Sequence, residues 1–356
     1  MNTPEGVPSG PRGLIDVHHH FMPPAYADAL RGAGLGDVAV AGQAEWSLDR
    51  SLALMDASGI EIAVLSLSAP GVYLGDVQRA RDLARACNEY GVGIRERAPG
   101  RIGLFAVLPI PFTAPACAEA IYALDTLRAD GVTLFGSAEG RFLGDPAYAD
   151  LMSELDARKA VVLVHPNLHV TSRQLALDVP GFLLEFPCDT TRAAVNLILT
   201  GTLERFPRIR WILAHAGGFL PFVAWRAALL NELPSVKERA PQGVLAYVRR
   251  FFYDTALSPS PGSVATLRSL VGPSQILFGS DFPFVPEPLV SMELETLDVA
   301  TSGPDGFGHG VGRGHALRLF PRFRGSREVG PGGRSVRKAS TREARESVRV
   351  RSEGCT

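Results

Sequence analysis

Three consecutive histidines, His18, His19 and His20, follow a short apolar run near the start of the sequence. In an extended strand, residues two apart face the same side, so His18 and His20 can face one centre while His19 faces away. Imidazole nitrogen is the commonest protein ligand for zinc and related divalent ions. The pair is therefore a candidate for two ligands of a metal site, although this motif alone is weak evidence.

Three further polar residues stand at the ends of other apolar runs. His165 ends VVLVH, His215 ends WILAH, and Asp281 ends ILFGSD. Taken singly, each could be an ordinary core or loop residue. Their repeated position after an apolar run favours one shared site, because the carboxyl ends of barrel strands meet at one mouth.

Eight apolar runs alternate with stretches that have helical periodicity. The runs are LIDVH, IAVLSL, IGLFAVL, GVTLF, AVVLVH, IRWILAH, FFYDTA and QILFGSD. Helices are expected at 47–59, 77–98, 114–129, 146–159, 190–206, 218–232, 263–271 and 286–300. Strand then helix, eight times, predicts the α/β class and a (β/α)8 TIM barrel. A doubly wound sheet is the alternative, but no run is followed by a GxGxxG turn or a P-loop.

The composition is that of a globular, enzyme-like chain. It has 356 residues, 46% of them hydrophobic, and a formal net charge of −1, so nothing in the charge suggests nucleic acid as a partner. No run is long enough to span a membrane, and the first residues do not resemble a secretion signal. Four widely spaced cysteines form no CxxC pair. We expect a cytoplasmic protein without a disulfide framework.

The chain is expected to have three parts. Residues 1–13 are rich in Pro and Gly and are predicted to be a flexible N-terminal segment. Residues 14–323 contain all the runs and form the predicted barrel. Residues 324–356 are rich in Arg, Ser and Gly with few large apolar residues, which predicts a basic, disordered tail.

These motifs together resemble the amidohydrolase superfamily, in the branch that contains aminocarboxymuconate-semialdehyde decarboxylase and the 6-methylsalicylate and γ-resorcylate decarboxylases. The resemblance runs from about Leu14 to Phe323. It is carried by IDVHHHFMPP, VHP, ERFPRIRWILAHAGGFLPFVAWR, FYDTA, FGSDFPF and HALRLFP. These are long matches in the same order, so their joint specificity is high.

The resemblance implies a single divalent ion with four ligands, which are His18, His20, His165 and Asp281, and it places His215 beside the ion as an acid, a base or a polarising group. The run GVTLF offers no Lys, Asp or Glu at its end that could bridge a second ion. Zinc suits three imidazoles and one carboxylate, and manganese is the alternative.

Five other residues are candidates for contacts around the ion. Arg226 resembles the arginine that family members use to bind a substrate carboxylate, with a surface salt bridge as its alternative. Arg192 is a second candidate, or a residue of a helix surface. Phe186 and Phe284 suit a flat ring, although core packing explains them equally well. Asp254 either orients a ligand or is structural.

Two reactions share such a site. In a hydrolase, a metal-activated water attacks an amide or a lactone, whereas in a decarboxylase the substrate carboxylate and a neighbouring oxygen bind the ion and a ring carbon is protonated. EFPCDTTRAAVNLI and AHAGGFLPFVAWR most resemble the 6-methylsalicylate type. We therefore expect a carboxy-lyase acting on a small ortho-hydroxybenzoate, with Asp281 as proton donor and His215 polarising or relaying.

Two further expectations complete this interpretation. AVAGQAEW lacks the basic residue that aminocarboxymuconate-semialdehyde enzymes carry before the first helix, so that substrate is not expected. A non-catalytic, metal-stabilised interaction module is a third hypothesis, against which the complete ligand set argues. The resemblance also implies a homodimer that takes a small aromatic acid as substrate and has no membrane partner.

Overall fold

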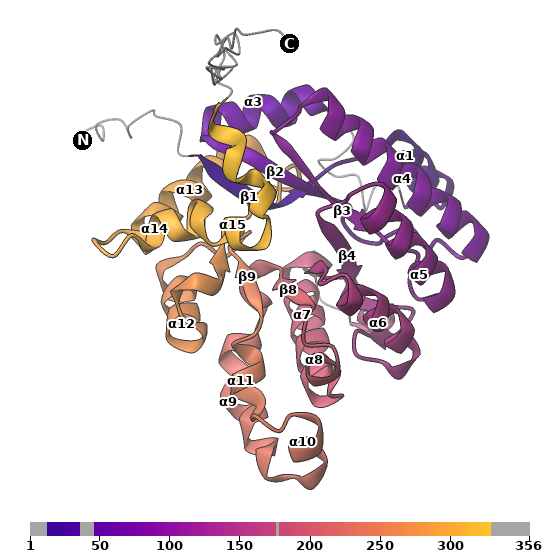
Figure 1. The fold of residues 1–356 in the computed structure, drawn as a ribbon, viewed down its shortest axis with the longest axis vertical. Coiled ribbons are helices and arrows are strands. Elements are labelled where there is room, and N and C mark those ends of the chain that lie inside the picture. The colour runs from indigo at the N-terminus through magenta and orange to yellow at the C-terminus, as the bar shows by residue number, and fades with distance from the viewer. Residues whose placement is uncertain (1–12, 36–45, 176–177, 329–356) are drawn as a thin grey trace, which may run out of the picture.

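The computed structural model describes residues 13–35, 46–175 and 178–328. Its centre is a parallel sheet of eight strands, which is curled into a nearly closed barrel and surrounded by helices (Figure 1). The strands follow one another around the sheet in chain order. The predicted (β/α)8 barrel is confirmed.

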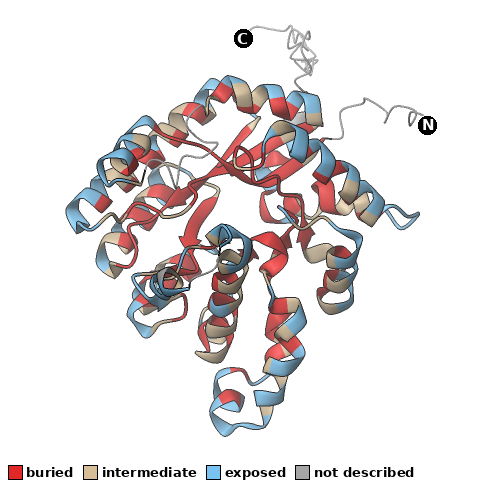
Figure 2. Cartoon of the chain, turned by 180° about the vertical axis from the view of Figure 1, so that it is seen from behind, coloured by how far each residue is buried: buried red, intermediate tan, exposed pale blue. Residues whose placement is uncertain are grey.

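Each barrel strand coincides with one of the predicted apolar runs. They are β1 (Leu14–His20), β2 (Ile60–Ser66), β3 (Ile102–Val107), β4 (Gly131–Phe135), β7 (Val161–His165), β8 (Arg210–Leu213), β9 (Phe252–Asp254) and β10 (Ile276–Leu277). The strands are buried on both faces, as Figure 2 shows by the red centre of the molecule. Ile62, Val64 and Phe105 belong to the cluster that fills the barrel interior. The opposite strand faces pack against the helices.

The longer helices cover the outside of the barrel (Figure 1). They are α3 (Leu48–Ser58), α4 (Val77–Arg97), α5 (Thr113–Ile121), α6 (Ala149–Ala157), α7 (Gly181–Leu199), α9 (Leu220–Ala228), α12 (Pro261–Val271) and α13 (Glu287–Thr301). Helix α3 begins and ends as expected, because the Ser47 side chain accepts a hydrogen bond from the Arg50 amide and Gly59 is left-handed, with a φ of 69°.

Several shorter elements were not predicted. They are α1 (Pro24–Gly32), α10 (Pro234–Arg239), α11 (Val244–Val248), α14 (Phe307–His309), α15 (Ala316–Leu319) and the antiparallel pair β5 (Ser137–Ala138) and β6 (Arg141–Phe142). The helix predicted at 190–206 is divided in the structure into the end of α7 and α8 (Thr202–Arg205). Short segments of 3-10 or π helix lie at Tyr122–Thr126, Pro146–Tyr148, Val170–Gln174, His215–Gly217, Leu229–Glu232, Pro273–Gln275, Gly310–Gly314 and Pro321–Glu328.

Helix α7 begins at Gly181 and not near residue 190, where the prediction placed it. The helix continues through Pro187, which lacks an amide hydrogen and usually ends or kinks a helix. The Thr191 hydroxyl donates a hydrogen bond of 2.7 Å to the Pro187 carbonyl. The additional N-terminal half of α7 lies next to the barrel mouth and carries Phe186.

The first and last strands meet at a seam that is joined by individual main-chain hydrogen bonds. The Val17 amide donates to the Phe278 carbonyl (3.0 Å), the Asp281 amide to the His18 carbonyl (2.8 Å) and the His20 amide to the Phe282 carbonyl (2.7 Å). The pairing of β1 with β2 also shifts register between Asp16 and His19. Such irregularities redirect side chains and are common beside active sites.

The predicted N-terminal and C-terminal segments lie mostly outside the residues that the structure describes. The predicted N-terminal segment lies outside the described residues except for Gly13. The 3-10 turn Pro321–Glu328 includes the first residues of the predicted tail, and 329–356 lie outside the described residues. None of the described helices combines the length and the apolar character that crossing a bilayer requires.

Candidate active site

Four candidate ligands converge at the mouth of the barrel. One ligand atom from each of His18, His20, His165 and Asp281 lies within 4.8 Å of all the others. The Nε2 atoms of His18 and His20 are 3.0 Å apart. Asp281 Oδ1 lies 3.0 Å from His20 Nε2 and 3.4 Å from His18 Nε2. Strands β1 and β7 and the segment after β10 therefore bring together residues that are far apart in the sequence.

The second nitrogen of each imidazole in this group faces a hydrogen-bond acceptor. His18 Nδ1 lies 2.8 Å from Asp254 Oδ2, His20 Nδ1 lies 3.1 Å from the Ser66 carbonyl oxygen, and His165 Nδ1 lies 2.8 Å from the Pro166 carbonyl oxygen. Because these oxygens can only accept, each Nδ1 carries a hydrogen. This arrangement orients the rings and directs Nε2 to the shared centre, as outer hydrogen bonds do for metal-binding histidines.

Burial and the two carboxylates act differently on these rings. Burial lowers the pKa of His20, His165 and His215, so that these rings are neutral at neutral pH. Burial also acts to lower the pKa of His18, but the charges of Asp254 and Asp281 raise it to about 9. The neutral rings leave Nε2 lone pairs available to a cation, whereas His18 would release its second proton on binding one.

Asp281 supplies an oxygen that needs a positively charged partner. Its Oδ1 is buried and has no hydrogen bond within the described chain. Burial acts to raise the pKa of Asp281, but the neighbouring histidines, His18 first among them, hold it below its ordinary value, so the group is a carboxylate. A buried anionic oxygen without a donor is costly. The three imidazoles and this oxygen therefore fit a divalent ion.

His215 lies beside this group on a strained segment of main chain. Its φ is 53°, and Ala216 has a φ of 56°, in the left-handed region that non-glycine residues rarely adopt. The ring centroids of His215 and His18 are 4.9 Å apart. His215 Nδ1 lies 3.1 Å from the Ala256 carbonyl oxygen, which leaves Nε2 to accept a proton.

Asp254, at the end of β9, connects His18 and His215. Its Oδ1 accepts hydrogen bonds from the amides of His215 (2.9 Å) and Ala256 (3.1 Å), and its Oδ2 accepts from the His18 ring. The space between His18 and Asp254 is filled by Gly279, where a Cβ would lie 2.7 Å from His18 Cβ. Contacts of this kind favour the orienting interpretation of Asp254.

Asp16 has a similar position at the seam and was missed by the sequence analysis. It accepts hydrogen bonds from the His18 amide (3.0 Å), the Ser280 amide (3.1 Å) and the Ser280 hydroxyl (2.5 Å). It also faces His19 Nδ1 at 3.0 Å, and His19 Nε2 lies 3.0 Å from the Ser51 hydroxyl. His19 thus points away from the ligand group. The available signal was an acid inside the otherwise apolar LIDV.

Glu293 on α13 is a second acid that the sequence analysis missed. It is buried, and its Oε2 has no hydrogen bond within the described chain. Burial, followed by the charge of Asp281, raises its pKa to about 8. A glutamate is an ordinary residue in a helix, so nothing in the local sequence distinguishes it.

The candidate substrate residues fall into two groups. Phe186 and Phe284 are half-buried and flank the ligand histidines, with ring centroids 5.9 Å from His165 and 5.2 Å from His20, respectively. Arg192 and Arg226 are exposed, and neither makes an ion pair within the described part of the chain. The aromatic walls are thus at the site of one chain, whereas the arginines are at its surface.

Phe135 occupies the end of β4, where the sequence analysis found no bridging group. It pairs with His165 in the sheet, and the two ring centroids are 6.0 Å apart. An apolar ring at this position agrees with the single-ion interpretation. His18, His215 and Asp254 form a second close group of possible ligands, but the Asp254 oxygens there already accept hydrogen bonds.

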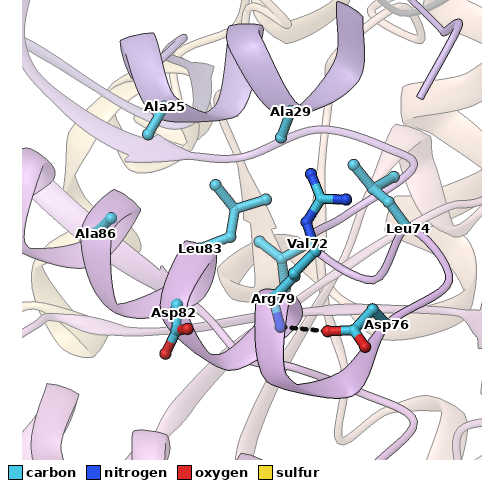
Figure 3. Close-up of a pocket in the computed structure, with 9 residues that line it drawn as sticks. All are labelled: Ala25, Ala29, Val72, Leu74, Asp76, Arg79, Asp82, Leu83 and Ala86. Carbon is cyan, nitrogen blue, oxygen red and sulfur yellow. Dashed lines mark hydrogen bonds between the residues drawn. The ribbon is translucent and has the colours of Figure 1, made fainter. Parts of the chain in front are cut away.

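Two hollows lie outside the ligand group. The larger, of about 300 Å³, lies between α1 and α4 on the outside of the barrel, and Figure 3 shows its lining. None of the ligand candidates lines it. A cavity of about 30 Å³ lies at the barrel mouth and is lined by segments that follow β2, β3, β4 and β7, including Phe135 and Asn167.

Comparisons with known proteins point in one direction. The family model described as amidohydrolase matches residues 15–322. The chain is 38% identical over 327 residues to decarboxylase macB from Penicillium terrestre, covering 87% of this chain and 95% of that protein. It is 37% identical over 316 residues to 6-methylsalicylic acid decarboxylase from Penicillium expansum, covering 87% and 97%.

Solved structures are similar over nearly the same part of the chain. An amidohydrolase II structure superposes with a TM-score of 0.79 at 31% identity and covers 86% of this chain and 99% of that one. A dihydroxybenzoic acid decarboxylase from Polaromonas, solved with manganese and the inhibitor 2-nitroresorcinol, has a TM-score of 0.75 at 24% identity and covers 88% and 98%. The second similarity concerns the fold alone.

Proposed function

The chain belongs to the amidohydrolase family, as its motifs predicted, and on that premise we propose that it is a metal-dependent carboxy-lyase. Its substrate is a small ortho-hydroxybenzoate of the salicylate or 6-methylsalicylate type. The observation that carries this proposal is the buried group of three imidazoles and the unpartnered Asp281 Oδ1 between two half-buried phenylalanines. The relatives named decarboxylases support the reaction type.

We assign one divalent ion to four ligands, which are His18, His20, His165 and Asp281. Zinc is the ion that this set of nitrogen and oxygen ligands suits first, and manganese is the alternative. When bound, the ion would hold and polarise the carboxylate and the ortho-hydroxyl group of the substrate.

The residues of the chain then orient the ring and move one proton. Phe186 and Phe284 hold the ring from two sides. Asp281, once protonated through His215, gives its proton to the ring carbon that bears the carboxylate. The bond to the carboxylate carbon then breaks, and carbon dioxide leaves while the electron pair of that bond returns to the ring. Because the neighbouring histidines lower its pKa, Asp281 is a carboxylate in the resting protein, so it must receive this proton before each turnover. His215 Nε2 relays the replacement proton, and Asp254 keeps His18 and His215 in position.

We also propose that a second copy of the chain covers an exposed apolar face. This face consists of Phe182 and Leu183 on α7 and Phe222, Trp225 and Leu229 on and just after α9, and α7 packs against α9. Phe222 and Trp225 are 75% and 71% exposed, which is unusual for such large apolar side chains in a monomer. Arg226 lies on the same helix, so a homodimer would bring its guanidinium to an interface where it can bind the substrate carboxylate of the other subunit.

The bounds of the catalytic domain and the cellular location of the protein are also proposals. We propose that residues 14–323 form the catalytic barrel and that 1–13 and 324–356 are flanking segments. Cys87, Cys117 and Cys188 are free thiols, which agrees with a reducing cytoplasm. Recovery of the protein from its native cells only in an exported fraction would contradict this location.

The experiment is a turnover assay on a panel of ortho-hydroxybenzoates. Protein loaded with Zn²⁺ or Mn²⁺ is incubated with each acid, and loss of the acid and formation of the phenol are followed by chromatography with mass detection. We expect phenol from at least one acid. His18→Ala should abolish its formation, whereas His309→Ala, which changes an exposed histidine away from the site, should leave the rate unchanged.

The outcome against the proposal is equally clear. A protein that binds one ion per chain but converts no member of the panel is not this carboxy-lyase. Hydrolysis of a lactone or an amide by the same preparation would then identify the site as that of a hydrolase.

A further inference from the structure

The proposed ligands lie in two halves of the barrel that are held in different ways. His18, His20 and Asp281 lie at the seam, where Asp16 and Asp254 accept several hydrogen bonds from the ligand-bearing segments. His165 belongs to β7, the fifth strand of the eight in the sheet order, across the barrel from the seam. Its Nδ1 donates to the carbonyl of the next residue, so the main chain after β7 sets the direction of the ring.

A third buried aspartate holds that segment. Asp189 lies on α7 and is fully buried. Its Oδ2 accepts a hydrogen bond of 2.8 Å from the Asn167 amide, and its Oδ1 accepts one of 2.5 Å from the Ser137 hydroxyl. The carboxyl group also packs against Gly136, where a Cβ would lie 2.4 Å from Oδ2. One side chain thus joins α7 to the segments that follow β4 and β7.

The Asn167 side chain extends this network across the barrel mouth. Its amide nitrogen donates to the Ser137 carbonyl (3.2 Å) and lies 3.5 Å from the Pro70 carbonyl after β2. Pro70, Phe135 and Asn167 also line the cavity of about 30 Å³ at the mouth. The network therefore holds in place the wall of the site that lies opposite the seam.

Stability alone does not account for a carboxylate at this position. Asp189 has no ion pair in the described part of the chain, and the charges of His169 and Arg192 act on it without hydrogen-bonding to it. Burial is the largest effect and raises its pKa to about 6. A buried carboxylate without a paired cation is costly, and a neutral side chain would pack at lower cost. What the carboxylate contributes in return is the alignment of two donors, the Asn167 amide and the Ser137 hydroxyl.

We infer that Asp189 is a positioning residue for the metal centre, because its hydrogen bonds to Asn167 and Ser137 fix the main chain after β7 and with it the direction of the His165 ring. Asp189 also fixes the turn of α7 that carries Phe186, whose ring packs on His165. This inference rests on the proposed metal site, and it assigns to Asp189 no contact with the substrate.

The test measures metal binding and needs no turnover. Full-length protein is titrated with Co²⁺, whose visible absorption reports the ligands around the ion, and affinity is measured by competition with a chromophoric chelator. For Asp189→Ala we expect about tenfold weaker binding and a changed Co²⁺ spectrum, the size of effect that loss of an orienting partner usually has. Asp189→Asn keeps an acceptor for the Asn167 amide and should recover most of the affinity.

Asp156→Ala is the matched control. Asp156, near the end of α6, is another buried aspartate that accepts a hydrogen bond from a main-chain amide, that of Arg208 at 2.7 Å. It also pairs with the Arg208 guanidinium, and this contact lies before β7 and β8, at the opposite end of the barrel. Its loss should lower the melting temperature and leave the Co²⁺ spectrum unchanged. If Asp189→Ala gives the same result as Asp156→Ala, Asp189 is merely structural and the inference is wrong.

Two further measurements keep the test decisive. If Asp189→Ala does not fold, Ser137→Ala removes only one of the two donors and should weaken Co²⁺ binding in the same direction; unchanged binding and spectrum would overturn the inference. If the wild type binds Co²⁺ as expected but decarboxylates nothing, the proposed reaction fails while the role of Asp189 stands.

Discussion

At the scale of single residues, the carboxyl groups around the site differ in what they contact. Asp16 and Asp254 each accept hydrogen bonds from two main-chain amides as well as from side chains, and so act on the position of the chain. Asp281 has an oxygen without a donor among the described residues, beside two imidazole nitrogens. Glu293 is buried, and burial raises its pKa and keeps its proton in place. The same functional group thus serves as support, as a proposed ligand or as a neutral acid.

We predict that Glu293 makes stability depend on pH. Its pKa is raised to about 8 by burial and by the charge of Asp281, with Asp16 and His18 also acting on it. Between its ordinary value and about 8, the folded protein retains a proton that the unfolded chain releases, so stability falls as the pH rises. Glu293→Gln should therefore melt at a higher temperature than the wild type at pH ~8, and at a similar temperature near pH ~5.

The measurement is a series of thermal melts across this pH range. Glu295→Gln, which changes an exposed glutamate on the same helix, is the control and should follow the wild type throughout. A curve for Glu293→Gln that runs parallel to the wild-type curve would show that Glu293 does not titrate as predicted.

The polar residues that end strands could be predicted from the sequence, whereas the buried acids that lie on helices behind them could not. His165, His215 and Asp281 were recognisable because a polar residue at the end of an apolar run is conspicuous. Asp189 and Glu293 lie on helices, where acids are common, and their partners are far away in the sequence. Their function depends on tertiary contacts that no local pattern records.

At the scale of elements, prediction succeeded where periodicity and burial coincide. All eight barrel strands were found, because each is buried on both faces and reads as an apolar run. The hairpin of β5 and β6 was missed, since two strands of two residues each carry no periodicity. The early start of α7 was missed, and a helix that continues through a proline such as Pro187 is not what the local sequence favours. That half of the helix carries Phe186.

The seam between β1 and the segment after β10 depends on the absence of a side chain at Gly279. A Cβ there would lie 2.7 Å from His18 Cβ and 3.3 Å from Asp254 Cβ, both of which are close to the main chain and cannot move far. We predict that Gly279→Ala costs about 1–3 kcal/mol of stability, as overpacking usually does, and weakens metal binding because His18 is displaced.

Thermal melts and the Co²⁺ titration measure both effects. Gly93→Ala in α4 is the control, since nothing lies within 4 Å of the added methyl group, and it should raise stability by about 0.5–1 kcal/mol. Wild-type metal affinity in Gly279→Ala would mean that the seam accommodates the methyl group without moving His18.

At the scale of the whole molecule, the barrel is closed by the same residues that form the candidate site. His18 and His20 come from the first strand and Asp281 from the segment after the last. A bound ion would therefore link the two edges of the sheet. We predict that saturating Zn²⁺, at 100 times its dissociation constant, raises stability by about 2.7 kcal/mol. Hydrogen exchange should slow more in β1 and around 276–282 than in β3, and equal slowing in all strands would contradict this mechanism.

The assembly is a separate prediction at this scale. Phe222→Glu with Trp225→Glu should convert the proposed homodimer into a monomer, because the charges would be buried in an apolar interface. Light scattering during gel filtration measures the mass. Val299→Glu changes an equally exposed apolar residue on α13, outside the proposed interface, and should remain dimeric. A monomeric wild type with full activity would exclude a subunit-bridging role for Arg226.

The seam also has a consequence for the order of events in a living cell. A ribosome releases β1 among the first parts of the chain, but the segment that carries Asp281 leaves the exit tunnel only after most of the barrel has been made. Nascent protein can therefore present a pair of imidazoles to cellular metal, but not the complete ligand group. If the four proposed ligands bind an ion, its full capture would be a late step of biosynthesis that coincides with closure of the barrel.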